Sequence, residues 1–187
     1  MSAKRSAKPP SKPKAGRRRE PRRTAPTVDI QVQSHLWDAQ PMVEQTVRTA
    51  IAAAAAELST SGGEVGILLT DDSAVRALNR NWRGLDQPTN VLSFPAPKAM
   101  AADDAGILGD IVVAYETLKR ECDDEGRDLL HHLAHLTVHG YLHLIGYDHQ
   151  TDAQANTMER LESKVMARMN LPDPWQDRDL VRDFGDA

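Results

Sequence analysis

Three histidines near the end of the sequence have the spacing of a metal site. His139 and His143 are four residues apart, so on a helix their side chains project from one face and can bind one ion. Gly146 follows, and glycine lets a backbone leave a helix through a conformation that is costly for other residues. His149 comes three residues later and can turn back as the third ligand. The pattern H-x3-H-x2-G-x2-H predicts one catalytic Zn²⁺ per chain, held by three imidazoles with water at the open position.

Three further histidines, His131, His132 and His135, precede this motif on the same apparently helical stretch. We expect them to lie at the helix surface or the edge of the core, where they could also orient a metal ligand through hydrogen bonds. All of the histidines could instead be ordinary polar residues of a histidine-rich helix. That interpretation does not explain why Gly146 and His149 follow at these positions.

The same spacing occurs in the metzincin zinc endopeptidases, whose motif is H-E-x-x-H-x-x-G-x-x-H with the glutamate as general base. In this sequence Gly140 follows the first histidine of the motif. A glycine cannot accept a proton, so the peptidase mechanism lacks its base. A zinc metallopeptidase stays open as an alternative, but the sequence favours a shared scaffold with different chemistry.

A second motif, NRNWRGLDQPTNVLSFP, spans residues 79–95 and concentrates hydrogen-bonding groups on a loop. Arg83 stands in its first third, after a helical pattern and before a glycine. A fixed guanidinium near a metal is suited to binding a phosphate and stabilising its transition-state charge. On the residues alone, an arginine that is simply exposed or bound to loop carbonyls is an equally good interpretation.

The two motifs RGLDQPTNVLSFP and HGYLHLIGYDH, with LGDIVV between them, resemble the YbeY family of bacterial ribosomal RNA maturation factors over about residues 28–170. The resemblance implies a single-strand-specific, metal-dependent endoribonuclease that acts in 16S rRNA 3′-end maturation and in ribosome quality control. It implies His139, His143 and His149 as zinc ligands and Arg83 as the functional arginine. The implied partners are single-stranded rRNA and the small ribosomal subunit, with a ribosomal protein or an assembly GTPase as further possibilities. A ribosome-assembly factor with a purely structural metal is the other alternative.

The chemistry of RNA cleavage is left open by these residues. A metal could generate hydroxide from bound water near neutral pH, or it could act only as a Lewis acid while the RNA 2′-OH attacks. Arg83 would hold the phosphate in either case. Asp148 lies next to His149, and we favour a role in orienting that ligand over a role as the base.

The elements that must position these residues can be read from hydrophobic patterns. Strands are expected at residues 27–33, 64–70, 91–94 and 106–115, the last interrupted at Gly109 and Asp110. Helices are expected at 41–58 with Pro41 in the first turn, from Asp71 or Asp72 to Trp82, and at 116–124, 127–145 and 152–169. The predicted fold is α+β, with a small mixed sheet, about five helices and a zincin-like metal-binding helix.

The charge distribution divides the chain into an arm, a body and a tail. Residues 1–25 hold ten Lys or Arg and one acid, which gives them a charge of +9. Since the net charge of the chain is −4, the remaining residues carry −13. We expect a disordered basic arm at 1–26, which could contact RNA phosphates, act only as a solubilising tail or be a transit peptide. The catalytic domain would span 27–170 and a tail 171–187. An acidic body repels RNA, so the attraction must come from elsewhere. Either the arm and the ribosome supply it, or several arginines cluster in the fold: Arg48, Arg76, Arg80, Arg83 and Arg120.

The cellular setting is only weakly indicated by composition. The single cysteine, Cys122, rules out an internal disulfide and a cysteine-based zinc site, and it fits a reducing compartment. No apolar run approaches the roughly 20 residues of a membrane-spanning helix. We therefore expect a cytoplasmic protein without a membrane partner.

Overall fold

The structure is a computed structural model that describes residues 25–97 and 106–176. The basic arm predicted for residues 1–26 lies almost entirely outside the described residues, as does most of the predicted tail.

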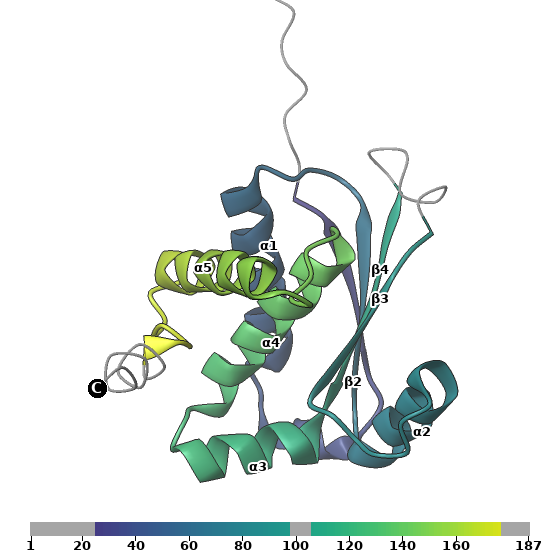
Figure 1. Ribbon diagram of the computed structural model, residues 1–187. Helices are drawn as coiled ribbons and strands as arrows, with labels where there is room; N and C mark the ends of the chain where they lie inside the picture. Colours follow the sequence, from purple (N-terminus) through teal and green to yellow (C-terminus); the bar gives the residue numbers. More distant parts are fainter. Residues whose placement is uncertain (1–24, 98–105, 177–187) are drawn as a thin grey trace, which may run out of the picture.

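Four strands form one mixed sheet at the centre of the fold (Figure 1): β1 (Thr27–Val32), β2 (Glu64–Thr70), β3 (Val91–Pro95) and β4 (Ile107–Ala114). Their order across the sheet is β1-β2-β4-β3. β1, β2 and β4 are parallel, and β3 pairs with β4 in the antiparallel direction. The sheet is therefore small and mixed, as predicted, and β3 is one of its edges.

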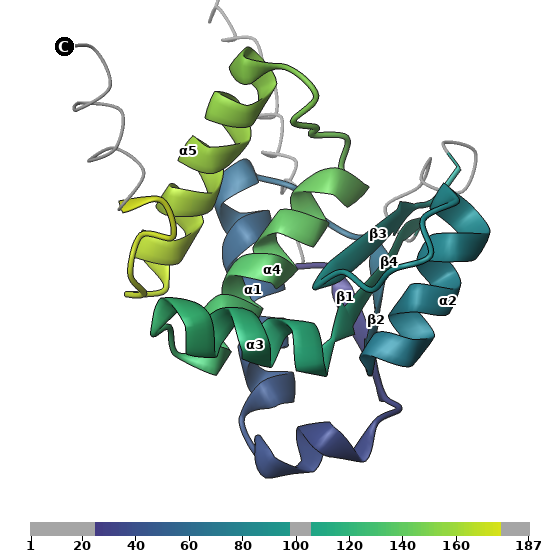
Figure 2. The same ribbon diagram turned by 60° about the horizontal axis from the view of Figure 1, so that its bottom comes forward.

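Within the described residues, five α-helices and one short 3-10 helix pack around the sheet. They are η1 (His35–Ala39), α1 (Val43–Leu58), α2 (Asp72–Arg83), α3 (Tyr115–Glu125), α4 (Leu129–Leu144) and α5 (Asp152–Arg168). Figures 1 and 2 show α4 in the middle of one face, beside α1 and α5, while α2 lies on the opposite face. The predicted α+β fold class and number of helices are confirmed, and the 3-10 helix is an element that the sequence patterns did not reveal.

The buried side chains divide between the two faces according to strand alternation. The larger core packs β1, β2 and β4 against α1, α4 and α5, with Ile67, Ile111 and Leu142 among its buried members. A smaller cluster packs α2 on the other face through Val75 and Leu92. Because α4 is held on both sides and along the sheet, it is a rigid support for the histidines it carries.

Several helix ends follow from recognisable caps, and two helices begin two residues later than predicted. Asp71 caps α2 by accepting the Ala74 N–H at 2.9 Å, which resolves the predicted choice between two aspartates. Pro41 lies outside α1, which begins only at Val43. Likewise α4 begins at residue 129 rather than 127, because the residue before it, Asp128, caps the helix by accepting the His131 N–H. Within the described part of the chain, no helix is long and apolar enough to cross a membrane.

Candidate metal centre

The three predicted histidines come together at the C-terminal end of α4. His139 and His143 lie one helical turn apart on α4, and His149 returns from the loop that follows it. The ring nitrogens they can offer to an ion all lie within 4.8 Å of one another. Gly146 has a φ of 96°, so the chain turns here through the left-handed region that favours glycine. The turn that the sequence predicted is thus the feature that returns His149 to the helix.

The hydrogen bonds of His139 and His143 determine which ring nitrogens face the site. His143 Nδ1 lies 3.0 Å from the Tyr147 carbonyl oxygen, which can only accept, so Nδ1 carries the proton. His139 Nδ1 lies 2.8 Å from Glu162 Oε1 and likewise donates to this carboxylate. Both Nε2 atoms are then left with lone pairs, and they lie 3.1 Å apart. Two nitrogens bound to one tetrahedral zinc at about 2.0–2.1 Å would be separated by about 3.3 Å, so the donor set fits a shared cation.

His143 is held in the neutral form that a metal ligand requires. Burial first, and then the neighbouring His139 and His149, lower the pKa of His143 to about 4. A neutral imidazole at physiological pH leaves its Nε2 lone pair available without competition from protons. The electrostatics of the site therefore agree with its geometry.

Glu162 on α5 is a site residue that the sequence reasoning missed. Its side chain is buried and accepts hydrogen bonds from His139 Nδ1, from His135 Nε2 at 3.1 Å and from Trp175 Nε1 at 2.9 Å. Burial would raise the pKa of this carboxyl, but the hydrogen bonds from the two histidines outweigh it and bring the pKa to about 2. Glu162 is thus an ionised carboxylate that fixes the ring orientation and tautomer of His139. Only an amphipathic pattern marks it in the sequence.

The remaining histidines of α4 differ in environment. His131 is exposed, as expected for a helix surface, whereas His132 and His135 are buried. His135 contacts the site indirectly, because it shares Glu162 with His139. Of these three histidines, His135 therefore has the contacts expected of a residue that helps to orient a metal ligand.

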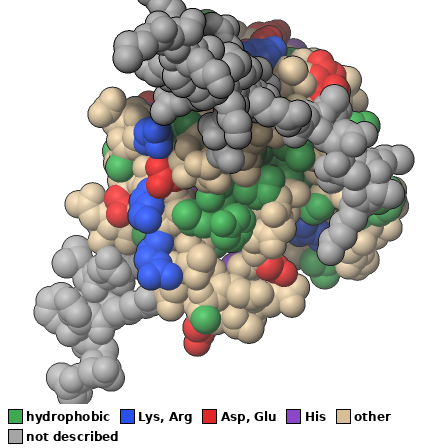
Figure 3. Space-filling model, turned by 90° about the horizontal axis from the view of Figure 1, so that it is seen from above, with side chains coloured by type: hydrophobic (Ala, Val, Ile, Leu, Met, Phe, Trp, Pro, Cys, Tyr) green, Lys and Arg blue, Asp and Glu red, His purple; other side chains and the backbone are tan. Residues whose placement is uncertain are grey.

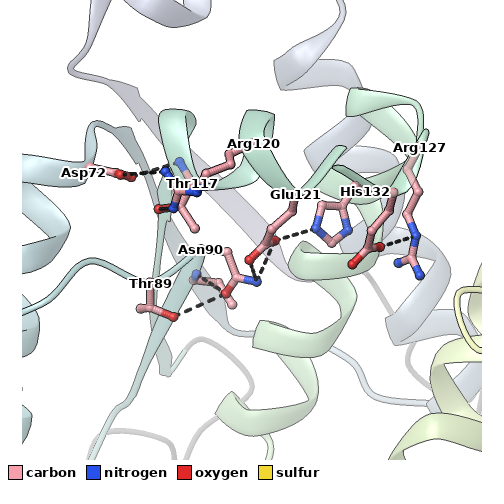
Figure 4. A network of polar contacts seen from close by, with 10 residues as sticks. Asp72, Thr89, Asn90, Thr117, Arg120, Glu121, Arg127 and His132 are labelled. Carbon is pink, nitrogen blue, oxygen red and sulfur yellow. Dashed lines mark hydrogen bonds and ion pairs between the residues drawn. The ribbon is translucent and has the colours of Figure 1, made fainter. Parts of the chain in front are cut away.

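His132 belongs to a second polar network, which anchors the loop of the second motif (Figure 4). Glu121 on α3 accepts from His132 Nε2 at 2.8 Å and from the Asn90 side-chain amide at 3.0 and 3.1 Å. Asn90 Oδ1 in turn accepts the Val91 N–H at 2.7 Å at the start of β3. The network joins the loop, α3 and α4, so the PTN segment of the motif has a positional function that its sequence did not specify.

Arg83 is the α2 arginine that forms no ion pair with the described residues. It is the last residue of the helix, and Gly84 ends the helix with a φ of 72°. Asp86 forms ion pairs with both of the other α2 arginines. It accepts two hydrogen bonds from Arg76 at 2.9 Å and lies 3.8 Å from Arg80. Among the described residues, Arg83 has no carboxylate partner, and its exposed side chain lines the cavity in front of the histidines.

This cavity measures about 660 Å³ and unites the two sequence motifs. Thr89, Asn90 and Ser93 line it from the loop and β3, opposite His139, His143 and His149. Asp148 also lines it, but its Oδ1 accepts the backbone N–H of His149 at 2.8 Å. The cavity combines a three-histidine cluster, an unpaired guanidinium and several hydroxyl and amide groups.

Gly140, which stands where a metzincin has its glutamate, faces the sheet. A Cβ at this position would lie 2.9 Å from Ile111 Cγ2 and 3.1 Å from Ser93 Oγ. There is consequently no room for a glutamate unless α4 moves away from β3 and β4. The packing thus weighs against the peptidase alternative.

The arginines considered for an RNA-attracting patch are spread over three helices. Arg48 on α1 pairs with Glu44 of the same helix at 3.8 Å, and Arg120 on α3 pairs with Asp72, the first residue of α2, at 3.7 Å. Arg76, Arg80 and Arg83 lie on α2, where only the last is unpaired among the described residues. Seen from above in Figure 3, Lys and Arg side chains form a row along one side, and hydrophobic side chains occupy the middle. Four of these five arginines thus have a carboxylate partner, and Arg83 is the one without such a partner among the described residues.

Comparisons with known proteins agree with this arrangement. A profile described as Endoribonuclease YbeY matches residues 29–170. The chain is 51% identical over 159 residues to Endoribonuclease YbeY of Rhodopseudomonas palustris, covering 82% of this chain and 92% of that protein. It is 48% identical over 167 residues to the Endoribonuclease YbeY of a Bradyrhizobium species, covering 86% and 99%.

A solved structure shows the same fold at low sequence identity. The solution structure of TM1509 from Thermotoga maritima matches with a TM-score of 0.52 and 20% identity, over 77% of this chain and 92% of that one. The family match spans both motifs and the three-histidine cluster. This chain belongs to the endoribonuclease YbeY family.

Proposed function

We propose that this protein is a single-strand-specific, metal-dependent endoribonuclease whose active site is the cavity between α4 and the β3 edge. In this proposal His139, His143 and His149 hold one Zn²⁺, and Arg83 binds the scissile phosphate. The observation that carries the proposal is that the Nε2 atoms of His139 and His143 lie 3.1 Å apart. Both Nε2 atoms have a lone pair, because Nδ1 of each ring donates its proton to an acceptor. Two such lone pairs repel each other unless a cation lies between them.

The roles of the side chains follow from their contacts. Zinc held by the three imidazoles would act as a Lewis acid toward the substrate phosphodiester. No carboxylate of the described residues pairs with Arg83, so its guanidinium can form bidentate hydrogen bonds with two phosphate oxygens. Because it binds the group on which charge develops, it stabilises the transition state more than the ground state.

Asp148 is assigned to positioning. Its carboxylate accepts the backbone N–H of His149 and so holds the loop that presents this ligand. The hydroxyl of Thr89 and that of Ser93 line the same cavity and can hydrogen-bond to RNA phosphate or ribose oxygens. Whether water or the RNA 2′-OH attacks is decided by the ends of the product, because a 2′,3′-cyclic phosphate arises only from attack by the 2′-OH.

The family points to a place for this activity in the cell. Its members are named as endoribonucleases, so the substrate class is RNA. We assign this chain to 16S rRNA 3′-end maturation and ribosome quality control in the cytoplasm, on the small ribosomal subunit. A ribosomal protein or an assembly GTPase could hold it there.

The test combines metal analysis with cleavage of a single-stranded RNA that carries a 16S 3′ precursor end. The wild-type chain should contain one zinc and cut the RNA, and His143→Ala should lose both. Arg83→Ala should keep the zinc but lose cleavage, whereas Arg80→Ala, one turn earlier on the same helix and paired with Asp86, should keep both. Retention of one metal by His143→Ala, or normal cleavage by Arg83→Ala, would contradict the assignment.

A metal with a purely structural role predicts a different order of events. Removal of the zinc by a chelator should then unfold the domain, as followed by circular dichroism, before or together with any loss of cleavage. For a catalytic metal, cleavage should be lost while the helical signal stays, and added zinc should restore it.

A further inference from the structure

A second groove lies on the other face of the sheet, beside α2. Among the described helices, α2 is the one on that face, and in Figure 1 it lies beside the lower part of the sheet. The groove, here called the Trp82 groove, has a volume of about 890 Å³, and its lining is mostly apolar. The residues that line it include Asp29, Gly66, Trp82, Phe94 and Asp110.

The strand register explains why a groove forms at this height. Asp29, Gly66, Asp110 and Phe94 are cross-strand neighbours in one row across β1, β2, β4 and β3. Gly66 contributes no side chain, so the row is hollow at β2. A Cβ at Gly66 would lie 2.2 Å from Asp110 Oδ1, which shows that this carboxylate leans into the hollow. In the described residues, the Asp110 carboxylate has no hydrogen-bond or ion-pair partner.

Trp82 forms an aromatic wall of the groove. It is 73% exposed, which is unusual for the side chain with the largest apolar surface. Its ring meets the ring of Phe94 edge-on, with centroids 5.9 Å apart. The contact with Phe94 therefore helps to hold the indole in place, while most of the indole surface stays accessible. An exposed aromatic ring that is held by a neighbouring ring can stack with a planar group of a ligand.

The Trp82 groove adjoins the catalytic cavity. Ser93 and Pro95 of β3 line both spaces, and among the described strands β3 lies at the edge of the sheet. Trp82 also directly precedes Arg83, so one turn of α2 supplies the stacking platform to one space and the guanidinium to the other. A strand that leaves the catalytic cavity over the edge of β3 would therefore enter the groove.

We propose that the Trp82 groove binds one unstacked nucleobase of the RNA strand whose scissile phosphate lies in the catalytic cavity. The proposal rests on the proposed ribonuclease function and adds to it a base-binding subsite. The base stacks on the Trp82 indole, and its exocyclic amino group donates to the Asp110 carboxylate. Stacking on exposed aromatic rings is the common way in which proteins hold single-stranded nucleic acids.

The charges of the groove distinguish a base from a phosphate. Asp29 and Asp110 would repel a phosphate, but a carboxylate is a good acceptor for the amino groups of cytosine, adenine and guanine. The groove thus admits the base and leaves the backbone outside. This subsite also gives a reason for single-strand specificity, because a base inside a duplex cannot reach the indole.

The test is a scan with single-stranded RNA oligonucleotides in which one abasic ribose is moved along both sides of the scissile bond. In the wild-type chain, one position should raise KM about fivefold or more, since stacking is worth about 1–3 kcal/mol per base. Trp82→Ala should raise KM for the unmodified RNA by a similar factor, with a far smaller change in kcat. In that variant the sensitive position should disappear, because the ring on which the base stacked is gone.

Two further variants control for folding and for general loss of apolar surface. Trp82→Phe keeps an aromatic ring and should retain most of the position dependence. Met42→Ala removes another exposed apolar side chain, at the start of α1, and should reproduce the wild-type scan. These two results, together with the loss of position dependence in Trp82→Ala, support the base subsite.

A flat scan in a wild-type chain that still cuts unmodified RNA overturns the subsite and leaves the ribonuclease function intact. An unchanged KM in Trp82→Ala does the same, and it would leave the groove to a protein partner or to the chain's own basic arm. Failure of the zinc-loaded wild-type chain to cut any of the oligonucleotides overturns the ribonuclease function, and the subsite with it.

Discussion

Replacing Glu162 by glutamine should release the metal without removing any metal ligand. Oε2 of this carboxylate accepts from Trp175 Nε1, an indole N–H that can only donate, so an oxygen must stay at that position. The new amide NH₂ must then replace Oε1, the atom 2.8 Å from His139 Nδ1. An NH₂ in this place needs an acceptor, and His139 can provide one only by moving its proton to Nε2. That tautomer has no lone pair to offer at the metal site.

The expected size of the effect follows from the contacts of the carboxylate. Loss of a group that orients a metal-binding histidine usually weakens metal affinity by about 10–100-fold. The metal-free protein should also be less stable, because the pKa of Glu162 falls from 4.5 to about 2 on folding. At about 1.4 kcal/mol per pKa unit, this corresponds to about 3 kcal/mol. Since the folded pKa is the lower one, this stability is present above pH 4.5 and is lost as the pH falls towards 2.

The assay is zinc competition against a chromophoric chelator at neutral pH, with urea unfolding of the metal-free protein alongside it. Glu121→Gln is a matched control, because Glu121 also accepts from a histidine of α4, but from one that is not a proposed ligand. Its zinc affinity should stay within about twofold of wild type. Equal zinc affinity in Glu162→Gln and the wild-type chain would refute the tautomer argument.

Three further predictions concern the parts that hold the site. Gly140→Ala should destabilise the fold by about 1 kcal/mol in urea unfolding, since crowding against Ile111 outweighs the helix propensity of alanine; a gain in stability would contradict the packing. NMR titration of the metal-free protein should give His143 a midpoint near pH 4. Because this folded pKa is below the ordinary value of 6.5, His143 should lower the stability of the fold as the pH falls from 6.5 to 4. A midpoint near 6.5 would contradict the burial of this ring. Asn90→Ala should cost about 1–3 kcal/mol and lower kcat/KM for RNA, because Glu121 loses a donor and the loop an anchor; unchanged values would remove the loop from the site.

The clustering of the three histidines could be predicted because they come from one short stretch of chain. His139 and His143 need only the periodicity of a helix, and the return of His149 needs only the glycine that ends it. The four strands were predicted for a similar reason, since each has a clear apolar pattern between turn residues. Local geometry therefore determines both, and the sequence displays local geometry directly.

The supporting groups could not be predicted, because they depend on contacts between distant segments. Glu162 reaches His139 only through the packing of α5 on α4, and a glutamate in an amphipathic helix normally faces solvent. The free state of Arg83 depends on Asp86, which binds two other arginines of the same helix. No spacing rule indicates which of three arginines a single aspartate leaves unpaired.

Gly140 shows how one residue can be interpreted correctly for chemistry while its structural cause stays hidden. In the sequence it counts as a missing base, and that conclusion directs attention from a peptide to a phosphodiester. In the structure it is the point where α4 approaches the sheet closely enough to touch Ile111 and Ser93. This close approach also brings β3, with its loop and Arg83, to the front of the histidines. The residue that removes the peptidase base thus contributes to the geometry in which Arg83 and the three histidines line one cavity. A helix kept further from the sheet by a side chain at this position would separate the two motifs, so Gly140→Ala should also lower RNA cleavage by more than its effect on stability explains.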